Sequence, residues 1–253
     1  TGDLLFREYL PNLDREEGGA KWTTNRWGMR DRDYPMEKPP GTVRIAVLGA
    51  SYTMGKRVAD GENFESQLEE MMNAVAPEGT RYELLNFAVD AYSPLEGVLL
   101  CRDKIARFDP DYMFYVEHGS ARFRLSERLA ERMISGVDLQ FDYLKELAHE
   151  ARAYPGISQT DANRGVYGKG EEALTWAYGE MARQCREKGI EPYLVLHPRT
   201  KENNSADSFR ELAELARSAG IGVLNIEDPY QGRDSEDLIL SRNDFHPNAE
   251  GHK

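Results

Sequence analysis

The stretch that most constrains the fold is residues 43–55, VRIAVLGASYTMG. Its first six residues are mostly β-branched and apolar, which is the composition of a buried strand. Gly49 ends that run, Ser51 follows within two residues, and the chain turns polar after Gly55. This order of strand, glycine turn, serine and helix places the Ser51 hydroxyl at the C-terminal edge of a parallel sheet. Sites form at that edge in open α/β folds. Helix N–H groups near such a serine can also stabilise an anion.

Two common loop motifs do not fit this stretch. A phosphate-binding loop needs G-x-x-x-x-G-K-[ST], but five residues separate Gly49 from Gly55, and an arginine follows Lys56. A nucleophile elbow needs G-x-S-x-G, and Thr53 stands where its second glycine belongs. An ordinary strand-to-helix turn with Ser51 as its N-cap remains an alternative.

Residues 49–55, GASYTMG, resemble the opening block G-D-S-x-T-x-G of the SGNH (GDSL) hydrolases, a family of serine esterases and acyltransferases. The aspartate of that block is Ala50 here, whereas the nucleophile position holds Ser51. The resemblance implies an α/β fold with three layers (α/β/α, flavodoxin-like) and a parallel sheet of about five strands. It also implies a Ser-His-Asp triad that needs no metal and no cofactor.

The C-terminal residues 241–252, SRNDFHPNAEGH, resemble the last block of the same family, in which an acid shortly precedes H-P-N-x-x-G-H. His246 takes the place of the catalytic base. The usual D-x-x-H spacing selects Asn243, whose amide cannot supply a negative charge. We therefore expect Asp244, two residues before His246, to be the acid, because the chemistry needs a carboxylate on the far nitrogen of the imidazole.

Residues 86–92, NFAVDAY, resemble the second block, N-x-G-V-x-G-Y, with alanine in place of both glycines. In the family, the backbone N–H at the first glycine donates to the oxyanion of the reaction. Ala88 keeps such an N–H, so the resemblance implies an oxyanion hole formed by Ser51 and Ala88. A plain strand end with Tyr92 packed in the core is the alternative.

The third family block, G-x-N-D, is absent, because residues 117–122 read EHGSAR. The missing asparagine normally donates a hydrogen bond to the oxyanion, and the loss of one such donor typically lowers the rate about 100- to 1000-fold. The candidate replacements are a backbone N–H at Gly119 or Ser120, where glycine lets the chain approach closely, and the side chains of His118, Ser120 and Arg122. We expect His118 or Arg122 to point at the Ser51 hydroxyl from within about 5 Å, or to reach it through one water.

The rest of the chain alternates strands and helices, which predicts a single parallel sheet with helices on both faces. Expected strands span residues 43–48, 81–89, 112–117, 192–197 and 222–226. Expected helices span residues 94–108, 171–188 and 208–218, and another follows the apolar pattern Phe64, Leu68, Met71 and Met72. His197 ends the fourth strand, where a hydrogen-bonded structural role is expected.

Residues 1–41 are expected to be an N-terminal extension and linker, and residues 42–253 the hydrolase-like domain. Proline and glycine at positions 35, 39, 40 and 41 mark the linker. Within the extension, residues 24–30, TNRWGMR, look like a lead-in segment that precedes the serine block in many SGNH proteins. We expect Trp22 and Trp27 to pack this segment against the domain.

Residues 121–170 are too long for a simple connection between a strand and a helix. Helical patterns at residues 124–134 and 139–153 are followed by a stretch rich in glycine and asparagine at residues 154–170. We therefore predict a helical insertion at the C-terminal edge of the sheet, where it could roof the site and exclude water. The alternative is an embellishment that only buries its own apolar face.

Composition excludes several classes of partner. The 253 residues are 40% hydrophobic, enough for one large α/β domain. The net charge of −12 disfavours nucleic acid and anionic membrane surfaces, and no apolar run is long enough for a membrane span. Cys101 and Cys185 are too few for a disulfide framework or a cysteine-based zinc site. The chain starts at a threonine, so we expect an upstream export signal or anchor and an extracytoplasmic location.

These observations favour a serine esterase that cleaves an acyl ester, with acetyl the first choice, from a small molecule or a glycan. A glycan O-acyltransferase on the same triad is an alternative, because only the acceptor differs. A binding protein on a decayed hydrolase fold is a third, motivated by the missing asparagine and the replaced aspartate. The oligomeric state stays open.

Overall fold

The computed structural model describes residues 4–5, 7–200 and 206–253. At its centre is a five-stranded sheet in the order β4-β3-β5-β6-β7, with every neighbouring pair parallel. The strands are β3 (Thr42–Leu48), β4 (Arg81–Asn86), β5 (Tyr112–Glu117), β6 (Glu191–Leu196) and β7 (Gly222–Asn225). The predicted α/β class and the parallel five-stranded sheet are confirmed.

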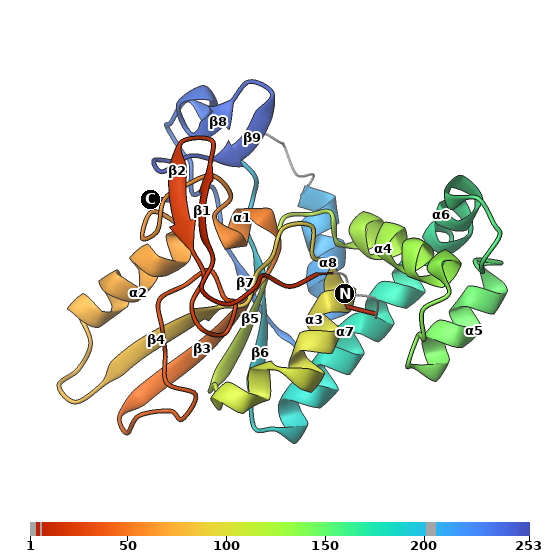
Figure 1. Ribbon diagram of the computed structural model, residues 1–253, viewed down its shortest axis with the longest axis horizontal. Coiled ribbons are helices and arrows are strands. Elements are labelled where there is room, and N and C mark those ends of the chain that lie inside the picture. The colour runs from red at the N-terminus through yellow and green to blue at the C-terminus, as the bar shows by residue number, and fades with distance from the viewer. Residues whose placement is uncertain (1–3, 6, 201–205) are drawn as a thin grey trace.

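Helices cover the sheet on both sides (Figure 1). The helices of this layer structure are α1 (Ser51–Met54), α2 (Phe64–Ala74), α3 (Pro94–Asp103), α7 (Gly170–Glu187) and α8 (Ala206–Ser218). In Figure 1, α2 lies to the left of the sheet, while α3 and α7 lie to its right. The result is the three-layer α/β/α arrangement predicted from the alternation of strands and helices.

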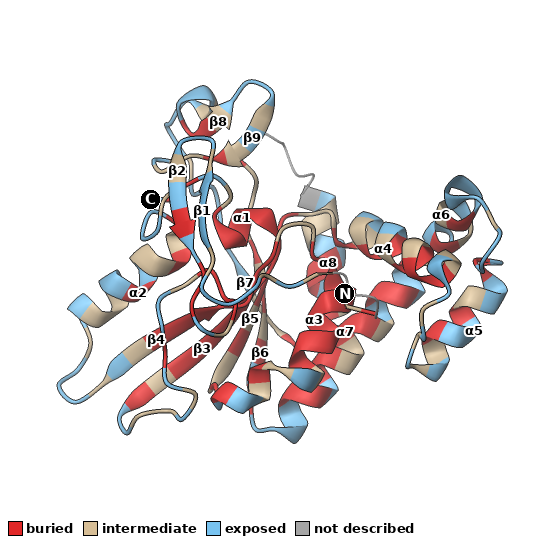
Figure 2. Ribbon diagram, viewed as in Figure 1, coloured by how far each residue is buried: buried red, intermediate tan, exposed pale blue. Residues whose placement is uncertain are grey.

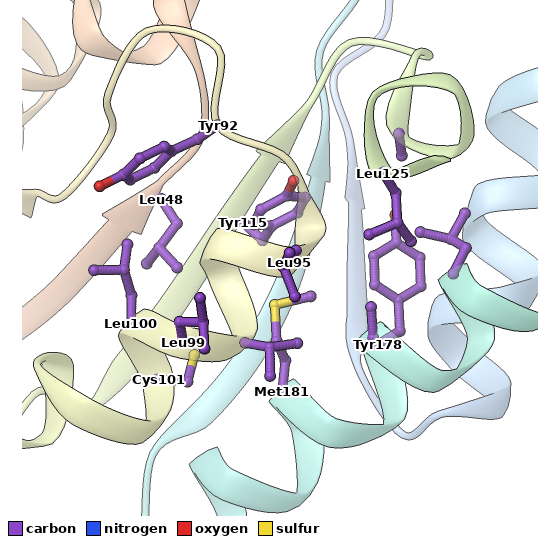
Figure 3. Close-up of a cluster of buried hydrophobic side chains, with 14 of the residues drawn as sticks. Leu48, Tyr92, Leu95, Leu99, Leu100, Cys101, Tyr115, Leu125, Tyr178 and Met181 are labelled. Atoms are coloured by element: carbon purple, nitrogen blue, oxygen red, sulfur yellow. The ribbon is translucent and has the colours of Figure 1, made fainter. Parts of the chain in front are cut away.

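The larger core lies between the sheet and the layer formed by α3 and α7. Figure 2 shows buried residues concentrated in the strands and in these two helices, and Figure 3 shows Leu48 and Tyr115 from the sheet with Leu95 and Met181 from the helices. Gly97 lets the helices approach, since a Cβ there would lie 2.7 Å from Met181 Sδ. Strands buried on both faces explain the long apolar runs in the sequence.

The helix predicted over residues 94–108 is interrupted. α3 ends at Asp103, and a separate 3₁₀ helix, η1 (Ile105–Phe108), follows. Lys104 between them has φ −123° and ψ −52°, outside the regular helix. The start of α3 is well defined, because Ser93 forms a capping box with Glu96 and a proline occupies the first turn.

α2 forms where the apolar pattern predicts it, but only Phe64 and Met72 of that pattern pack against the smaller core of the sheet. Leu68 and Met71 are 38% and 66% exposed. The fully buried residues of α2 are Glu65 and Glu69. Glu69 Oε2 accepts hydrogen bonds from Tyr34 Oη at 2.6 Å and from a backbone N–H of β4 at 2.7 Å. Polar partners from other segments therefore override the local hydrophobic pattern.

The insertion contains three helices, α4 (Ala121–Ser135), α5 (Asp142–Glu150) and α6 (Gln159–Tyr167). α6 lies in the stretch rich in glycine and asparagine, for which no helix was predicted, and its N-cap Ser158 accepts a hydrogen bond from Asp161 N. α4 packs against α3, α6 and α7. Figure 1 shows α5 and α6 to the side of the molecule, away from α1, so the expected roof over the site is not formed by these helices.

The N-terminal segment is more than a linker. It contains a hairpin of β1 (Asp14–Glu17) and β2 (Ala20–Thr23), which lies beside α1 in Figure 1. Trp22 is buried, and the ring of Trp27 packs edge-on against Phe108 at 5.7 Å. These contacts attach residues 7–41 to the domain, as the two tryptophans suggest.

The C-terminal segment forms η2 (Ser235–Asp237) and a second small hairpin, β8 (Ile239–Ser241) with β9 (Asp244–Pro247). Figure 1 shows this hairpin above α1 at the top of the molecule. Tyr52 Oη donates a 2.6 Å hydrogen bond to the carbonyl of Phe245, which fastens β9 to α1. No helix in the described part of the chain has the length and apolar character needed to cross a bilayer.

Candidate active site

Ser51 is the first residue of α1, directly after the turn that follows β3. Gly49 makes this turn possible, because a Cβ there would lie 2.2 Å from Thr53 Oγ1. Gly55 ends the helix in the left-handed conformation, with φ 78°. The predicted order of strand, glycine turn, serine and helix is therefore formed, with α1 as a single turn.

Three polar side chains form a continuous hydrogen-bonded chain at this position. His246 Nε2 lies 2.7 Å from Ser51 Oγ, and His246 Nδ1 lies 2.5 Å from Asp244 Oδ1. β9 brings the last two residues to the nucleophile turn across 195 positions of sequence. Asn243 takes no part in this chain, and its backbone N–H donates to the Ser241 hydroxyl.

Asp244 is held in its charged form. Burial raises the pKa of this carboxyl, but hydrogen bonds from His246 and the charge of Arg57 outweigh it, so the pKa lies below the ordinary 3.8. Arg57 Nη1 donates to Asp244 Oδ2 at 2.9 Å. A carboxylate on Nδ1 keeps the proton on that nitrogen, so Nε2 is free to accept the Ser51 proton.

A cavity of about 320 Å³ is lined by Tyr52 and Pro247, the chain neighbours of Ser51 and His246, but by neither Ser51 nor His246 themselves. Tyr52, the neighbour of the serine, lines it, and its ring packs between His246 and His118 with centroids 4.9 and 4.7 Å away. Phe64 and Tyr230 contribute aromatic walls. A cavity of this size with aromatic walls is suited to part of a small ester substrate.

The N–H of Ala88 is already used within the protein. It donates to Asn86 Oδ1 at 3.1 Å, and Ala88 is 1% exposed. An oxyanion could use this N–H only by replacing that hydrogen bond. The sequence-based assignment of Ala88 to the oxyanion hole therefore has to compete with an internal acceptor.

Ala91, to which the sequence pattern assigns no role, has an unusual backbone. Its φ is +65°, which is the left-handed conformation. This conformation is unfavourable for any residue that has a Cβ, and it is often found at functional sites. Its N–H has no hydrogen-bond acceptor among the residues that the structure describes. An ion pair of 3.1 Å between Lys56 and Asp90 ties its loop to the end of α1. The sequence signal was the second glycine position of the family block, occupied here by alanine.

The His118 side chain is unsuited to donate to an oxyanion. Its Nδ1 lies 2.8 Å from the carbonyl oxygen of His197, and a carbonyl only accepts, so Nδ1 carries the proton. Burial lowers the pKa of His118 well below 6.5, so the ring is neutral near pH 7. Nε2 therefore carries a lone pair. The replacement of the asparagine by His118 stays a prediction, and this proton arrangement argues against it.

The other two candidates of this turn are engaged elsewhere. Ser120 N–H donates to Glu117 Oε1 at 2.9 Å, and Ser120 Oγ accepts from Arg124 Nε at 2.8 Å. The guanidinium of Arg122 lies over the ring of Tyr167 in α6, 5.1 Å from its centroid. Arg122 is thus directed at the helical insertion. Neither side chain hydrogen-bonds to Ser51 within the described residues.

No protein-family model matches the chain, and no curated protein sequence matches it. Several solved structures are similar to the chain in fold. TesA is 12% identical, with a TM-score of 0.52 over 83% of this chain and 91% of TesA. LAE5, an α/β hydrolase from the metagenome of Lake Arreo, Spain, is 13% identical, with a TM-score of 0.52 over 83% of this chain and 89% of LAE5.

A third similar structure is the two-domain esterase CEX, described as active on acetylated mannans. It is 15% identical, with a TM-score of 0.50 over 83% of this chain and 46% of CEX. At these identities the likeness is one of fold. This chain therefore has the three-layer α/β/α fold of the SGNH hydrolases.

Proposed function

We propose that this protein is a serine esterase that cleaves an acyl ester through a triad of Ser51, His246 and Asp244. One observation carries the proposal, the unbroken chain from Ser51 Oγ to His246 Nε2 at 2.7 Å and from His246 Nδ1 to Asp244 Oδ1 at 2.5 Å. A nucleophile within hydrogen-bond reach of a base, which a third group orients, is the arrangement that activates a serine.

In this mechanism, Ser51 Oγ attacks the ester carbonyl while His246 Nε2 takes the hydroxyl proton. The charged Asp244 stabilises the imidazolium that forms. His246 then gives the proton to the leaving alcohol, and an acyl-serine remains. Water, deprotonated by His246, attacks the acyl group and frees the serine.

The oxyanion needs hydrogen-bond donors aimed at the carbonyl oxygen. We assign this role to the N–H groups of Ser51 and Ala91, neither of which has a hydrogen-bond acceptor within residues 4–5, 7–200 and 206–253. Both lie at the C-terminal edge of the sheet, after the neighbouring strands β3 and β4. Each such donor contributes about 100- to 1000-fold in rate.

For the substrate we propose an acetyl or another short acyl ester on a small molecule or a glycan. CEX, of similar fold, is described as active on acetylated mannans, which favours a carbohydrate. The cavity beside Tyr52, about 320 Å³ in volume, has room for a short acyl chain or part of one sugar ring.

The test compares Ser51→Ala with the wild type on p-nitrophenyl acetate. Ser126→Ala is a matched control, because Ser126 is also a buried helical serine. We expect Ser51→Ala to lose turnover and fluorophosphonate labelling while its circular dichroism stays unchanged, and Ser126→Ala to keep both. Equal turnover in Ser51→Ala and the wild type would contradict the proposal.

The same assay separates the two other candidate functions. An added oligosaccharide that speeds donor consumption and becomes acylated, as detected by mass spectrometry, would indicate acyl transfer on the same triad. A folded wild type that neither labels nor turns over any ester would instead indicate a binding protein.

A further inference from the structure

α1 holds the nucleophile but is too short to be stable alone. A single helical turn forms only one or two internal hydrogen bonds, and its last carbonyls need outside partners. The carbonyls of its first two residues accept N–H groups of the backbone that follows. Thr53 O accepts from Asn86 Nδ2 at 3.2 Å, and Met54 O accepts from Arg30 Nη1 at 2.6 Å. Two residues from outside α1 thus complete its C-terminal end.

Arg30 is a buried cation whose partners are backbone carbonyls. It is 2% exposed, and it also donates to the carbonyls of Gly55 and Val58. Its guanidinium lies 5.6 Å from the ring centroid of Trp22. A Cβ at Gly55 would lie 2.6 Å from Arg30 Nη1, so the glycine makes room for the guanidinium. The planar fork of arginine reaches several carbonyls at once, which an ammonium group cannot do.

The next residue, Asp31, holds the neighbouring strand. Its Oδ2 accepts from the backbone N–H of Asn86 at 2.9 Å, at the end of β4. The Asn86 side chain in turn bonds Thr53 O and accepts from Ala88 N. Arg30 and Asp31 together therefore tie the nucleophile turn to the start of the loop that carries Ala91.

Asn25 preforms the turn that presents these two residues. Its Oδ1 accepts from the N–H groups of Trp27 at 2.9 Å and Met29 at 3.0 Å, and its Nδ2 donates to Arg32 O at 2.9 Å. Gly28 within the turn has φ 74°. The shape of the segment is therefore fixed by its own hydrogen bonds in addition to its contacts with α1.

We propose that residues 24–32 are a positioning clamp that sets Ser51 relative to the oxyanion loop, with Arg30 as its main positioning residue. The proposal rests on the proposed function. A misplacement of about 1 Å in an active site can lower the rate about 100-fold, so the clamp acts on the rate without touching the substrate.

The test uses Arg30→Lys, with Arg44→Lys as the matched control. Arg44 is buried at the opposite end of β3 and also donates to backbone carbonyls, including those of Met36 and Phe108. We expect Arg30→Lys to lower kcat about 100-fold with little change in KM, and to slow fluorophosphonate labelling of Ser51 as much. Arg44→Lys should lower Tm but keep the wild-type kcat.

Hydrogen exchange gives a readout that needs no activity. We expect faster exchange of residues 51–58 in Arg30→Lys than in Arg44→Lys. If Arg30→Lys does not fold, Asn25→Ala loosens the turn and keeps the guanidinium, with the same expected changes. Unchanged kcat and unchanged exchange in the folded clamp variant would overturn the clamp. If the wild type shows no ester turnover, the proposed function is refuted but the clamp is not. The hydrogen exchange of residues 51–58 in the two variants then tests whether the clamp holds α1.

A second, independent observation concerns the two cysteines of the chain. Cys101 in α3 and Cys185 in α7 are each 1% exposed, and their Sγ atoms lie 3.8 Å apart. One helical turn earlier, Gly97 and Met181 let the same two helices approach closely. Figure 3 shows Cys101 in this packed layer.

We infer that Cys101 and Cys185 form an intramolecular disulfide when the chain folds in the presence of a low-molecular-weight disulfide. The Cys185 thiolate attacks glutathione disulfide and releases one glutathione. The Cys101 thiolate then attacks the mixed disulfide, the Sγ–Sγ bond forms, and a second glutathione leaves. The two cysteine protons pass to the two glutathione thiolates, so two thiols are oxidised and one disulfide is reduced.

The geometry of the folded chain favours this pair. The Sγ atoms need to approach from 3.8 Å to about 2.0 Å, a small shift for two side chains.

The test refolds the full chain with glutathione disulfide and counts free thiols under denaturing conditions. We expect no free thiols and a mass lower by two hydrogen atoms. The Tm should lie about 10 °C above that of the reduced chain, since the bond closes a long loop. Cys101→Ser should show neither the mass change nor the Tm shift. Two free thiols, or only mixed disulfides with glutathione, would overturn the inference.

Discussion

Arg57 Nη1 lies 2.9 Å from Asp244 Oδ2, so the acid of the proposed triad is shared between an imidazole and a guanidinium. Arg57 also pairs with Glu17 of the β1–β2 hairpin at 3.1 Å. The N-terminal hairpin is thus linked to the triad through one side chain. Arg57 is 41% exposed, so solvent weakens this ion pair.

The Arg57→Gln variant measures what this link contributes. Asp244 keeps its bond to His246 in the variant, and exposed ion pairs are worth about 0–1 kcal/mol. We therefore expect kcat/KM to fall by at most about five-fold at neutral pH. Glu17→Gln is the control and should leave kcat/KM unchanged. A loss of 100-fold or more in Arg57→Gln would show that the guanidinium has a larger role.

The role of Asp244 as the acid is tested by moving the carboxylate from position 244 to position 243. Asp244→Asn should lower kcat about 10⁴-fold with Tm little changed, because an amide does not keep the reactive tautomer of His246. Adding Asn243→Asp should not restore activity, since Asn243 does not contact His246 in the described structure. Recovery of activity in this double variant would mean that the usual family spacing supplies the acid.

His118 should affect stability more than rate. His118→Phe leaves the carbonyl of His197 without its donor, which costs about 1–3 kcal/mol and lowers Tm. Its kcat should stay within a few-fold of the wild type, because the neutral ring offers no donor at Nε2. Arg122→Met should also keep its rate. A 100-fold loss of kcat in a folded variant would restore that residue as an oxyanion donor.

Glu65 should make stability depend on pH. Burial raises the pKa of Glu65 to about 8, so the folded protein keeps its proton where the unfolded chain, near 4.5, has lost it. The folded state then binds more protons, and this contribution to stability is lost as pH rises from about 4.5 to 8.

The Glu65→Gln variant isolates this effect. We expect its free energy of unfolding, relative to the wild type, to increase from pH 5 to pH 8 by up to a few kcal/mol. Chemical denaturation at several pH values measures the difference. Glu62→Gln, on an exposed side chain two residues before α2, is the control and should show no trend. A difference independent of pH in Glu65→Gln would contradict the raised pKa.

Most of the fold can be predicted from local sequence patterns. The β-branched run before Gly49 specifies a strand, and the glycine allows the tight turn that puts Ser51 at the head of α1. The parallel five-stranded sheet also followed from the alternation of patterns, because strand and helix periods are properties of near neighbours. α6 was missed because glycine and asparagine have low helix propensity, and packing on α4 stabilises the helix.

Sequence by itself determined which residues can do the chemistry, namely the serine, histidine and aspartate types and the order in which they occur. Only the tertiary structure decided the hydrogen bonds around them. The proton of His118 lies on Nδ1 because a carbonyl 79 residues away accepts it, and Arg30 meets α1 because folding brings carbonyls 24–28 residues away into its reach. The direction of a hydrogen bond depends on its partner, and a partner distant in sequence leaves no local pattern.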